Sequence, residues 1–172
     1  SYCSFCQAVD HLDLSTACFA IDTWQGDEHA GAYGPEVFAE LTRYHDARYG
    51  TFSSLVRSTF ADALTMFADG GIDLLHVDGA HGYDAVRRDV ETWLPKLSPR
   101  GVLLLHDIAE HRPGFGVHRV WDELTRLYPH FSFTHSHGLG VLAVGPEQSS
   151  AVRWLTAGDR TAAEVAAIRQ HV

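Results

Sequence analysis

Two aspartates and two histidines occupy positions in this sequence where they could carry out chemistry together. Asp78 follows the first of two short apolar runs, and His81 comes three residues later. His106 and Asp107 directly follow the second apolar run. Carboxylates bind hard divalent cations, and an imidazole exchanges protons near neutral pH. These residue types predict metal binding or acid–base chemistry, provided that the fold brings the ends of the two runs together.

The residues between the two runs indicate how the fold would do so. The runs Ile72–Val77 and Val102–Leu105 have the length of strands, and Val86, Val90 and Trp93 between them repeat near the helical period. The order strand, helix, strand indicates a βαβ unit and a parallel sheet. Ligands of open α/β sheets bind beyond the carboxyl ends of the strands. The four polar side chains are therefore expected at the edge where such folds place their chemistry.

The rest of the chain predicts an α/β fold with a doubly wound, mostly parallel sheet. Further parallel strands are expected near 17–22 and 52–57, and an antiparallel hairpin near 130–145. A single domain is expected, with a core over 1–145 and a C-terminal helical tail over 146–172. Because the chain opens on a helical pattern, the first strand of the sheet is predicted to be missing with an N-terminal piece. A gap at the sheet centre, or an edge filled by another chain as in a homodimer, is expected.

Composition limits the partners of the chain. A length of 172 residues suits one domain, and a formal net charge of −9 argues against nucleic acid or an anionic membrane surface as a partner. No apolar run has the length of a membrane span, and no signal-peptide pattern opens the sequence. Cys3, Cys6 and Cys18 make no disulfide framework, so a reducing, cytoplasmic location is expected. Cys3 and Cys6 form a C-x-x-C motif, for which a redox or zinc role is the minor alternative.

Several segments together carry a family pattern. They are Ala20–Gly31, Ile72–Gly79 with His81 and Tyr83, Trp93–Gly101, and the pair His106-Asp107. In these segments the chain resembles the class I S-adenosylmethionine-dependent methyltransferases, and within them the bacterial branch associated with glycosyltransferases (methyltransferase domain family 24-like). The resemblance covers roughly residues 1–145 and implies a Rossmann-like methyltransferase fold. The glycine-rich first motif of the family, which cradles the methionine part of the cofactor, would precede Ser1.

The resemblance implies a set of residues that bind S-adenosylmethionine. The set consists of Asp22, Thr23, Trp24, Ser58, Thr59, Phe60 and Asp78. Asp22 would accept hydrogen bonds from the ribose hydroxyls, as a carboxylate can, and Phe60 would contact the adenine. The alternatives are that Asp22 caps a loop and that Phe60 belongs to the core.

The resemblance also implies a metal site formed by Asp78, His106 and Asp107. The two carboxylates suit Mg²⁺, which prefers oxygen ligands, whereas His106 would better suit another divalent metal such as Mn²⁺ or Fe²⁺. The alternative is that His106 and Asp107 form a hydrogen-bonded strand end that binds no metal.

Catalysis is implied for His81, with Asp78 beside it. In the sugar O-methyltransferases that the chain resembles, a histidine at this position is the general base that takes the proton of the acceptor hydroxyl. The alternative is that His81 is a helix-start residue with a local hydrogen bond. His29 and His111 are weaker candidates for contact with the acceptor.

The sequence thus predicts a metal-assisted O-methyltransferase that acts on a hydroxyl group of a sugar or other small polyol. The acceptor would be a small molecule or a glycan. A competing hypothesis is a degenerate methyltransferase-like domain with an interaction or scaffolding role. A Rossmann-type domain with another nucleotide cofactor is disfavoured, because no G-x-G-x-x-G motif follows a predicted strand.

Overall fold

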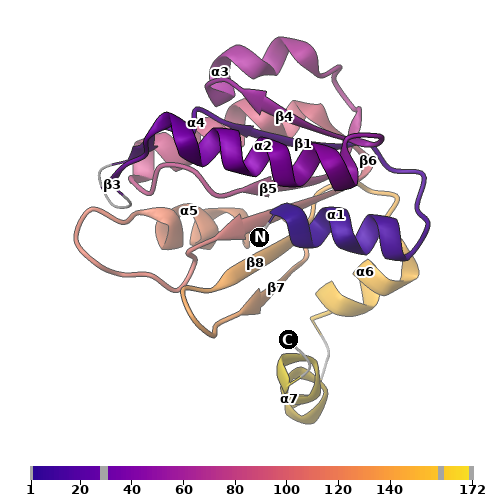
Figure 1. Cartoon of the computed structure of the whole chain (residues 1–172). Helices are drawn as coiled ribbons and strands as arrows, with labels where there is room; N and C mark the ends of the chain where they lie inside the picture. Colours follow the sequence, from indigo (N-terminus) through magenta and orange to yellow (C-terminus); the bar gives the residue numbers. More distant parts are fainter. Residues whose placement is uncertain (1, 28–30, 159–160, 171–172) are drawn as a thin grey trace. The chain divides into compact units, whose positions relative to one another are not determined.

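A computed structural model describes residues 2–27, 31–158 and 161–170 of the chain (Figure 1). The chain forms two compact units, Ser1–Thr65 and Met66–Val172. Each unit contains a parallel pair of strands connected through a helix, so the expected α/β class is confirmed. The expectations of one domain and of a gap at the centre of one sheet stay predictions.

The first unit is built around the parallel strands β1 and β4. Its elements are α1 (Tyr2–His11), β1 (Cys18–Asp22), β2 (Gly26–Asp27), β3 (Gly31–Ala32), α2 (Pro35–Tyr49), β4 (Ser53–Arg57) and α3 (Phe60–Ala63). Strands β1 and β4 pair over their whole length, and β2 pairs antiparallel with β3. Helix α2 connects β1 to β4 and starts at a proline, which suits the first turn because its missing N–H would have no helical partner there.

A buried polar cluster joins α1 and α2 to β4. Ser53 Oγ lies 2.5 Å from the Tyr2 hydroxyl, 2.7 Å from His45 Nε2 and 3.4 Å from Cys6 Sγ. Burial raises the pKa of Tyr2 above its usual value. The cysteines of the described chain, Cys6 among them, are free thiols. Because each polar atom finds a partner here, the cluster fixes both helices on the strand without leaving a buried group unsatisfied.

The second unit carries a mixed sheet. Its elements are β5 (Ile72–Val77), α4 (Tyr83–Trp93), β6 (Leu97–His106), α5 (Val117–Leu124), β7 (His130–Phe133), β8 (Leu139–Ala143), α6 (Ser150–Thr156) and α7 (Ala162–Gln170). The strand order is β5-β6-β8-β7. Strands β5 and β6 are parallel, whereas β8 pairs antiparallel with both β6 and β7. The predicted βαβ unit and C-terminal hairpin are both confirmed.

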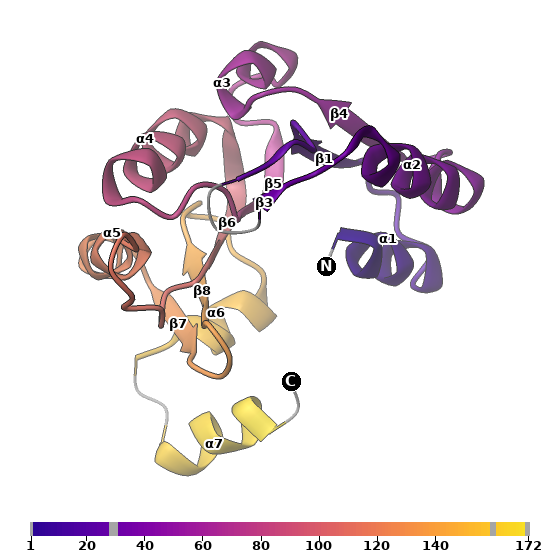
Figure 2. The same cartoon turned by 60° about the vertical axis from the view of Figure 1, so that its left-hand side comes forward.

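Alternate residues of β6 pack on opposite faces of this sheet. Leu103 and Leu105 are 0% and 1% exposed and belong to the cluster that includes residues of α4 and α5. Val102 and Leu104 belong to a second cluster, against which residues of α6 and α7 pack. Figure 2 shows α4 and α5 on one side of the sheet and α6 on the other. A strand that is buried on both faces reads as a continuous apolar run, which is why its sequence was conspicuous.

Strand β6 begins at Leu97, earlier than the apolar run had indicated. Leu97 pairs with Ile72, and the register then shifts before Leu74 pairs with Val102. The intervening residues are polar or are proline and glycine, so hydrophobic pattern alone did not reveal them as strand.

In the described part of the chain, no helix is both long enough and apolar enough to cross a membrane.

Gly140 in β8 provides a test of the packing between the hairpin and α5. A Cβ atom at this position would lie 2.3 Å from Cζ3 of Trp121, a ring that is only 6% exposed and donates to Ser132. Gly140→Ala should therefore lower the free energy of unfolding by about 1–3 kcal/mol through overpacking, measured by urea titration. Gly158→Ala, where nothing lies within 4 Å of the added carbon, is the control. Equal stability of the two variants would contradict this packing.

Candidate functional site

The carboxyl ends of β5 and β6 bring the predicted site residues together. The two strands pair in parallel up to the residues that directly precede Asp78 and His106. Asp107 follows the end of β6, and His81 lies in the short connection between β5 and α4. Because neighbouring parallel strands end at the same edge of a sheet, the four side chains gather at that edge.

His106 lies between the two carboxylates. Its Nδ1 atom is 3.2 Å from Asp78 Oδ1 and 3.2 Å from Asp107 Oδ1. This nitrogen is buried and has no hydrogen-bond partner within the described chain, although both oxygens lie within ion-pair distance. The side chain of Asp78 is 40% exposed and that of Asp107 is 9% exposed. The cluster is therefore open to solvent on the Asp78 side and closed on the Asp107 side.

His81 completes the cluster from the other side of Asp107. Its Nε2 atom lies 2.9 Å from Asp107 Oδ2. One potential ligand atom from each of Asp78, His81 and Asp107 lies within 4.8 Å of the other two. A small hollow adjoins these groups, and its apolar lining comes from Val86, Leu105 and Val117 among others. Apolar walls lower the local dielectric constant and so strengthen interactions between the charges beside them.

The backbone of Asp107 has an unusual conformation. Its φ angle is 62°, in the left-handed region that only a few residue types, aspartate among them, adopt readily. The Asp107 N–H donates to the Gly138 carbonyl at 3.0 Å, and the Asp107 carbonyl accepts from the Glu110 N–H at 3.1 Å. These two bonds hold the chain in a turn that no hydrophobic pattern could have predicted.

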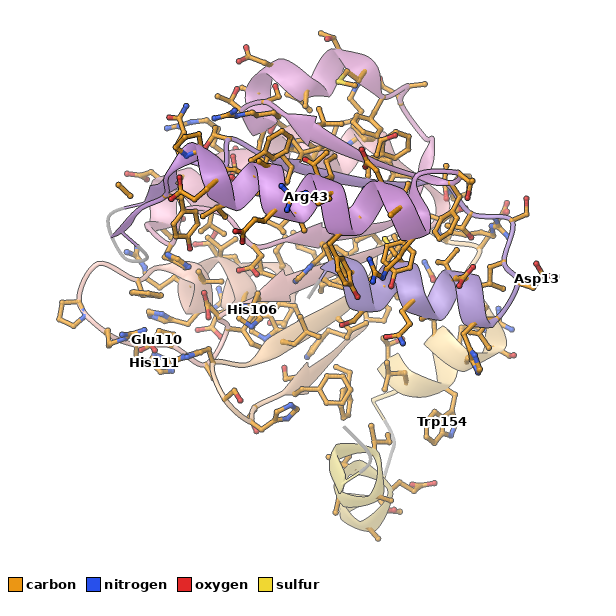
Figure 3. All side chains as sticks on the ribbon, viewed as in Figure 1. Asp13, Arg43, His106, Glu110, His111 and Trp154 are labelled. Carbon is orange, nitrogen blue, oxygen red and sulfur yellow. The ribbon has the colours of Figure 1, made fainter. Side chains whose placement is uncertain are left out.

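The loop between β6 and α5 begins at this turn. Glu110, labelled in Figure 3, accepts the Arg112 backbone N–H at 3.0 Å, and its other carboxylate oxygen lies 3.1 Å from His137 Nδ1. The backbone N–H of Arg112, helped by His137, lowers the pKa of Glu110 below its usual value. His111 is exposed on the same loop, with its ring centroid 4.4 Å from that of His118. The structure places His111 on the loop that leaves the site, whereas His29 lies outside the described residues.

Sequence reasoning missed Phe115 on this loop. Its ring stacks on the imidazole of His81, with centroids 4.5 Å apart and planes inclined by 25°. The available signal was an aromatic residue flanked by Gly114 and Gly116, in the loop that follows the predicted metal residues. A glycine-flanked aromatic residue has many possible partners, so the sequence could not show that His81 was the one.

The first unit holds most of the predicted cofactor residues. Asp22 ends β1 and is exposed, and its Oδ1 atom accepts the Trp24 N–H at 2.8 Å. The Asp22 carbonyl accepts the Ser58 N–H at 2.9 Å, which brings the ends of β1 and β4 together. Thr23, between Asp22 and Trp24, accepts Arg57 Nε through its carbonyl at 3.2 Å. The loop-capping role weighed for Asp22 is thus observed, and it occupies one of the two carboxylate oxygens.

The other predicted cofactor residues have structural partners of their own. Trp24 is 8% exposed, and its ring centroid lies 4.6 Å from that of Phe38. Thr59 caps α3 by accepting the Asp62 N–H at 3.1 Å, and Phe60 is the half-buried first residue of that helix. Asp78 lies in the second unit. The ring of Trp24 is therefore mainly a packing group, whereas Thr59 and Phe60 stay near the strand end where they were expected.

Comparisons with known proteins agree with this architecture. A family model described as a methyltransferase domain matches residues 1–108, more than half of the chain. The uncharacterized protein y4gI of Sinorhizobium fredii (strain NBRC 101917 / NGR234) is 52% identical over 147 residues, which are 86% of this chain and 16% of that protein. The chain therefore spans about a sixth of the length of this curated relative.

Two solved structures show the same fold at low sequence identity. The SAH-bound methyltransferase PaMTH1 of Podospora anserina has a TM-score of 0.52 at 15% identity, over 81% of this chain and 75% of that one. The O-methyltransferase TomG of Streptomyces achromogenes, solved with SAM and involved in tomaymycin synthesis, has a TM-score of 0.51 at 15% identity, over 84% of this chain and 89% of that one. These structures show a shared fold, and the family match shows that the chain belongs to the methyltransferase domain family.

Proposed function

We propose that the protein is a metal-assisted O-methyltransferase that transfers the methyl group of S-adenosylmethionine to a hydroxyl of a sugar or other small polyol. The observation that carries the proposal is the cluster in which His106 Nδ1 lies 3.2 Å from an oxygen of Asp78 and of Asp107, with His81 Nε2 2.9 Å from the second oxygen of Asp107. It combines a cation-binding set with an imidazole at its margin. The family match supports the methyl donor.

The donor set fits a divalent cation. Ligand atoms of Asp78, His81 and Asp107 all lie within 4.8 Å of one another, and His106 Nδ1 lies 3.2 Å from one oxygen of each aspartate without belonging to that group. A buried nitrogen that approaches two carboxylate oxygens without a hydrogen bond is also what a shared ion would explain. Asp78 and Asp107 suit Mg²⁺, and His106 favours Mn²⁺ or Fe²⁺. When bound, the ion would orient the acceptor hydroxyl and lower its pKa.

His81 is proposed as the general base. In the transfer, the acceptor oxygen bonds to the methyl carbon while the carbon–sulfur bond breaks, and the electron pair of that bond goes to sulfur. The hydroxyl proton goes to the imidazole of His81, whose Nε2 atom contacts Asp107 Oδ2 at 2.9 Å. Asp107, almost fully buried, holds the imidazole in place and stabilises its charged form. An alternative role for His81 is a further metal ligand, because its nitrogen falls within the same 4.8 Å group.

The first unit is proposed to bind the cofactor. The exposed carboxylate of Asp22 has a second oxygen, Oδ2, beside the one that accepts from Trp24, and ribose hydroxyls are suitable donors for it. Thr23, Ser58, Thr59 and Phe60 lie at the same strand ends and are proposed to contact the adenosine. The direct test of donor identity is isothermal titration of the intact protein with S-adenosylhomocysteine, with and without Mg²⁺. If S-adenosylhomocysteine binds neither with nor without Mg²⁺, the result would favour the scaffolding hypothesis.

Substitution of His81 should separate catalysis from cofactor binding. His81→Ala should lower turnover by roughly 10²–10⁴-fold, the usual scale for a positioned acid–base group, while the affinity for S-adenosylhomocysteine stays unchanged. Asp22→Ala should instead weaken cofactor binding, because it removes the ribose acceptor. Steady-state kinetics and calorimetry measure the two effects. Full activity of His81→Ala would move the base role to Asp78 or to a metal-activated hydroxyl.

Metal removal should abolish activity reversibly. Chelation with EDTA should stop methyl transfer, and Mg²⁺ or Mn²⁺ should restore it. Asp107→Asn should weaken Mn²⁺ binding by at least about tenfold, since it removes a ligand charge, whereas Asp84→Asn, an exposed aspartate in the first turn of α4, should not. Calorimetry with Mn²⁺ gives both affinities. If His81→Ala weakens Mn²⁺ binding as much as Asp107→Asn does, His81 is a ligand and not the base.

A further inference from the structure

The imidazole of His81 is covered on one face by Phe115. The two rings are nearly parallel, inclined by 25°, with centroids 4.5 Å apart. Such stacking, together with the contact of His81 Nε2 with Asp107, restricts the imidazole in two directions. A ring held by an edge contact and a face contact has little freedom to rotate out of its orientation.

The ring of Phe115 also contacts Arg112. The guanidinium carbon of Arg112 lies 4.9 Å from the Phe115 ring centroid, a cation–π distance. Arg112 is held in turn by Glu110, whose carboxylate lies 3.0 Å from Arg112 Nε and also accepts the Arg112 backbone N–H. Glu110, Arg112, Phe115, His81 and Asp107 therefore form one continuous series of contacts.

Both ends of the loop that carries Phe115 are tied to the site. At one end, the Glu110 N–H donates to the Asp107 carbonyl at 3.1 Å, and at the other the Gly116 N–H donates to the His81 carbonyl at 2.8 Å. A Cβ atom at Gly116 would lie 2.5 Å from the backbone nitrogen of Tyr83, so the loop docks closely on the start of α4. The position of Phe115 is thus fixed by the same backbone that fixes Asp107 and His81.

We infer that Phe115 is a positioning residue for methyl transfer, which holds the His81 imidazole in the orientation in which its Nε2 atom contacts Asp107. The inference rests on the proposed function of His81 as the base. Phe115 touches neither cofactor nor acceptor in this role and acts through His81.

The first arm of the test observes the His81 ring without catalysis. In histidine-labelled intact protein free of cofactor and metal, NMR at one pH should show ring-current-shifted His81 protons, assigned with His81→Gln. Phe115→Ala should remove the shift and Phe115→Tyr should retain it. The matched control is Phe67→Ala, which truncates another half-buried phenylalanine that packs against an aromatic ring, Trp93, with centroids 5.4 Å apart and planes inclined by 60°. It should leave the His81 signals unchanged.

The second arm measures methyl transfer by the same variants. Phe115→Ala should lower kcat roughly ten- to hundredfold, the scale expected for a misplaced catalytic group, with the KM for S-adenosylmethionine unchanged. Phe115→Tyr should recover most of kcat, and Phe67→Ala should match the wild type. If Phe115→Ala behaves like Phe67→Ala in both arms while the wild type is active, the positioning role is wrong. A wild type that shows the ring-current shift but transfers no methyl group contradicts the proposed function instead.

Discussion

The site depends on one constraint, the parallel register between β5 and β6. A slip of one residue would move Asp78 by about 3.3 Å relative to His106 and turn one of them to the opposite face of the sheet. The register is held by burial, because Leu103 and Leu105 belong to one apolar cluster and Val102 and Leu104 to the other. In a slipped strand, Leu103 and Leu105 would turn away from the helices α4 and α5 that they pack against, and Val102 and Leu104 would take their place. The core of the second unit therefore sets the distances between the side chains of the site.

Much of this architecture could be predicted because strands that are buried on both faces leave a strong mark in sequence. The apolar runs at Ile72–Val77 and Val102–Leu105, with a helical pattern between them, were sufficient to predict parallel strands and to place Asp78 and Asp107 at one edge. The start of β6 at Leu97 was not predictable in this way. The residues that follow Leu97 are polar or are proline and glycine, and the pairing with β5 shifts register between Leu97 and Val102. Ser98 and Arg100 in this stretch are held by hydrogen bonds to Asp73, which a hydrophobic pattern does not report.

The site was predictable in composition but not in its contacts. Which side chains would meet followed from the strand ends, whereas the approach of His81 Nε2 to Asp107 and the stacking of Phe115 depend on loop conformations. Those conformations are set by single hydrogen bonds, such as that from Gly116 to His81, which carry no periodic signal. Two carboxylates and two imidazoles lie within contact distance of one another, an arrangement that no periodic pattern in the sequence reports.

The left-handed conformation of Asp107 limits what can replace this residue. A non-glycine residue held at a φ of 62° carries a strain of about 1–3 kcal/mol unless, as with aspartate or asparagine, its short polar side chain tolerates that region. Glutamate, which has the same charge and would count as a conservative change elsewhere, combines the backbone penalty with one additional methylene. Glycine relieves the strain and removes the charge. The backbone conformation of the turn and the charge of the side chain thus both favour aspartate at this position, for unrelated reasons. Few substitutions of Asp107 would satisfy both requirements.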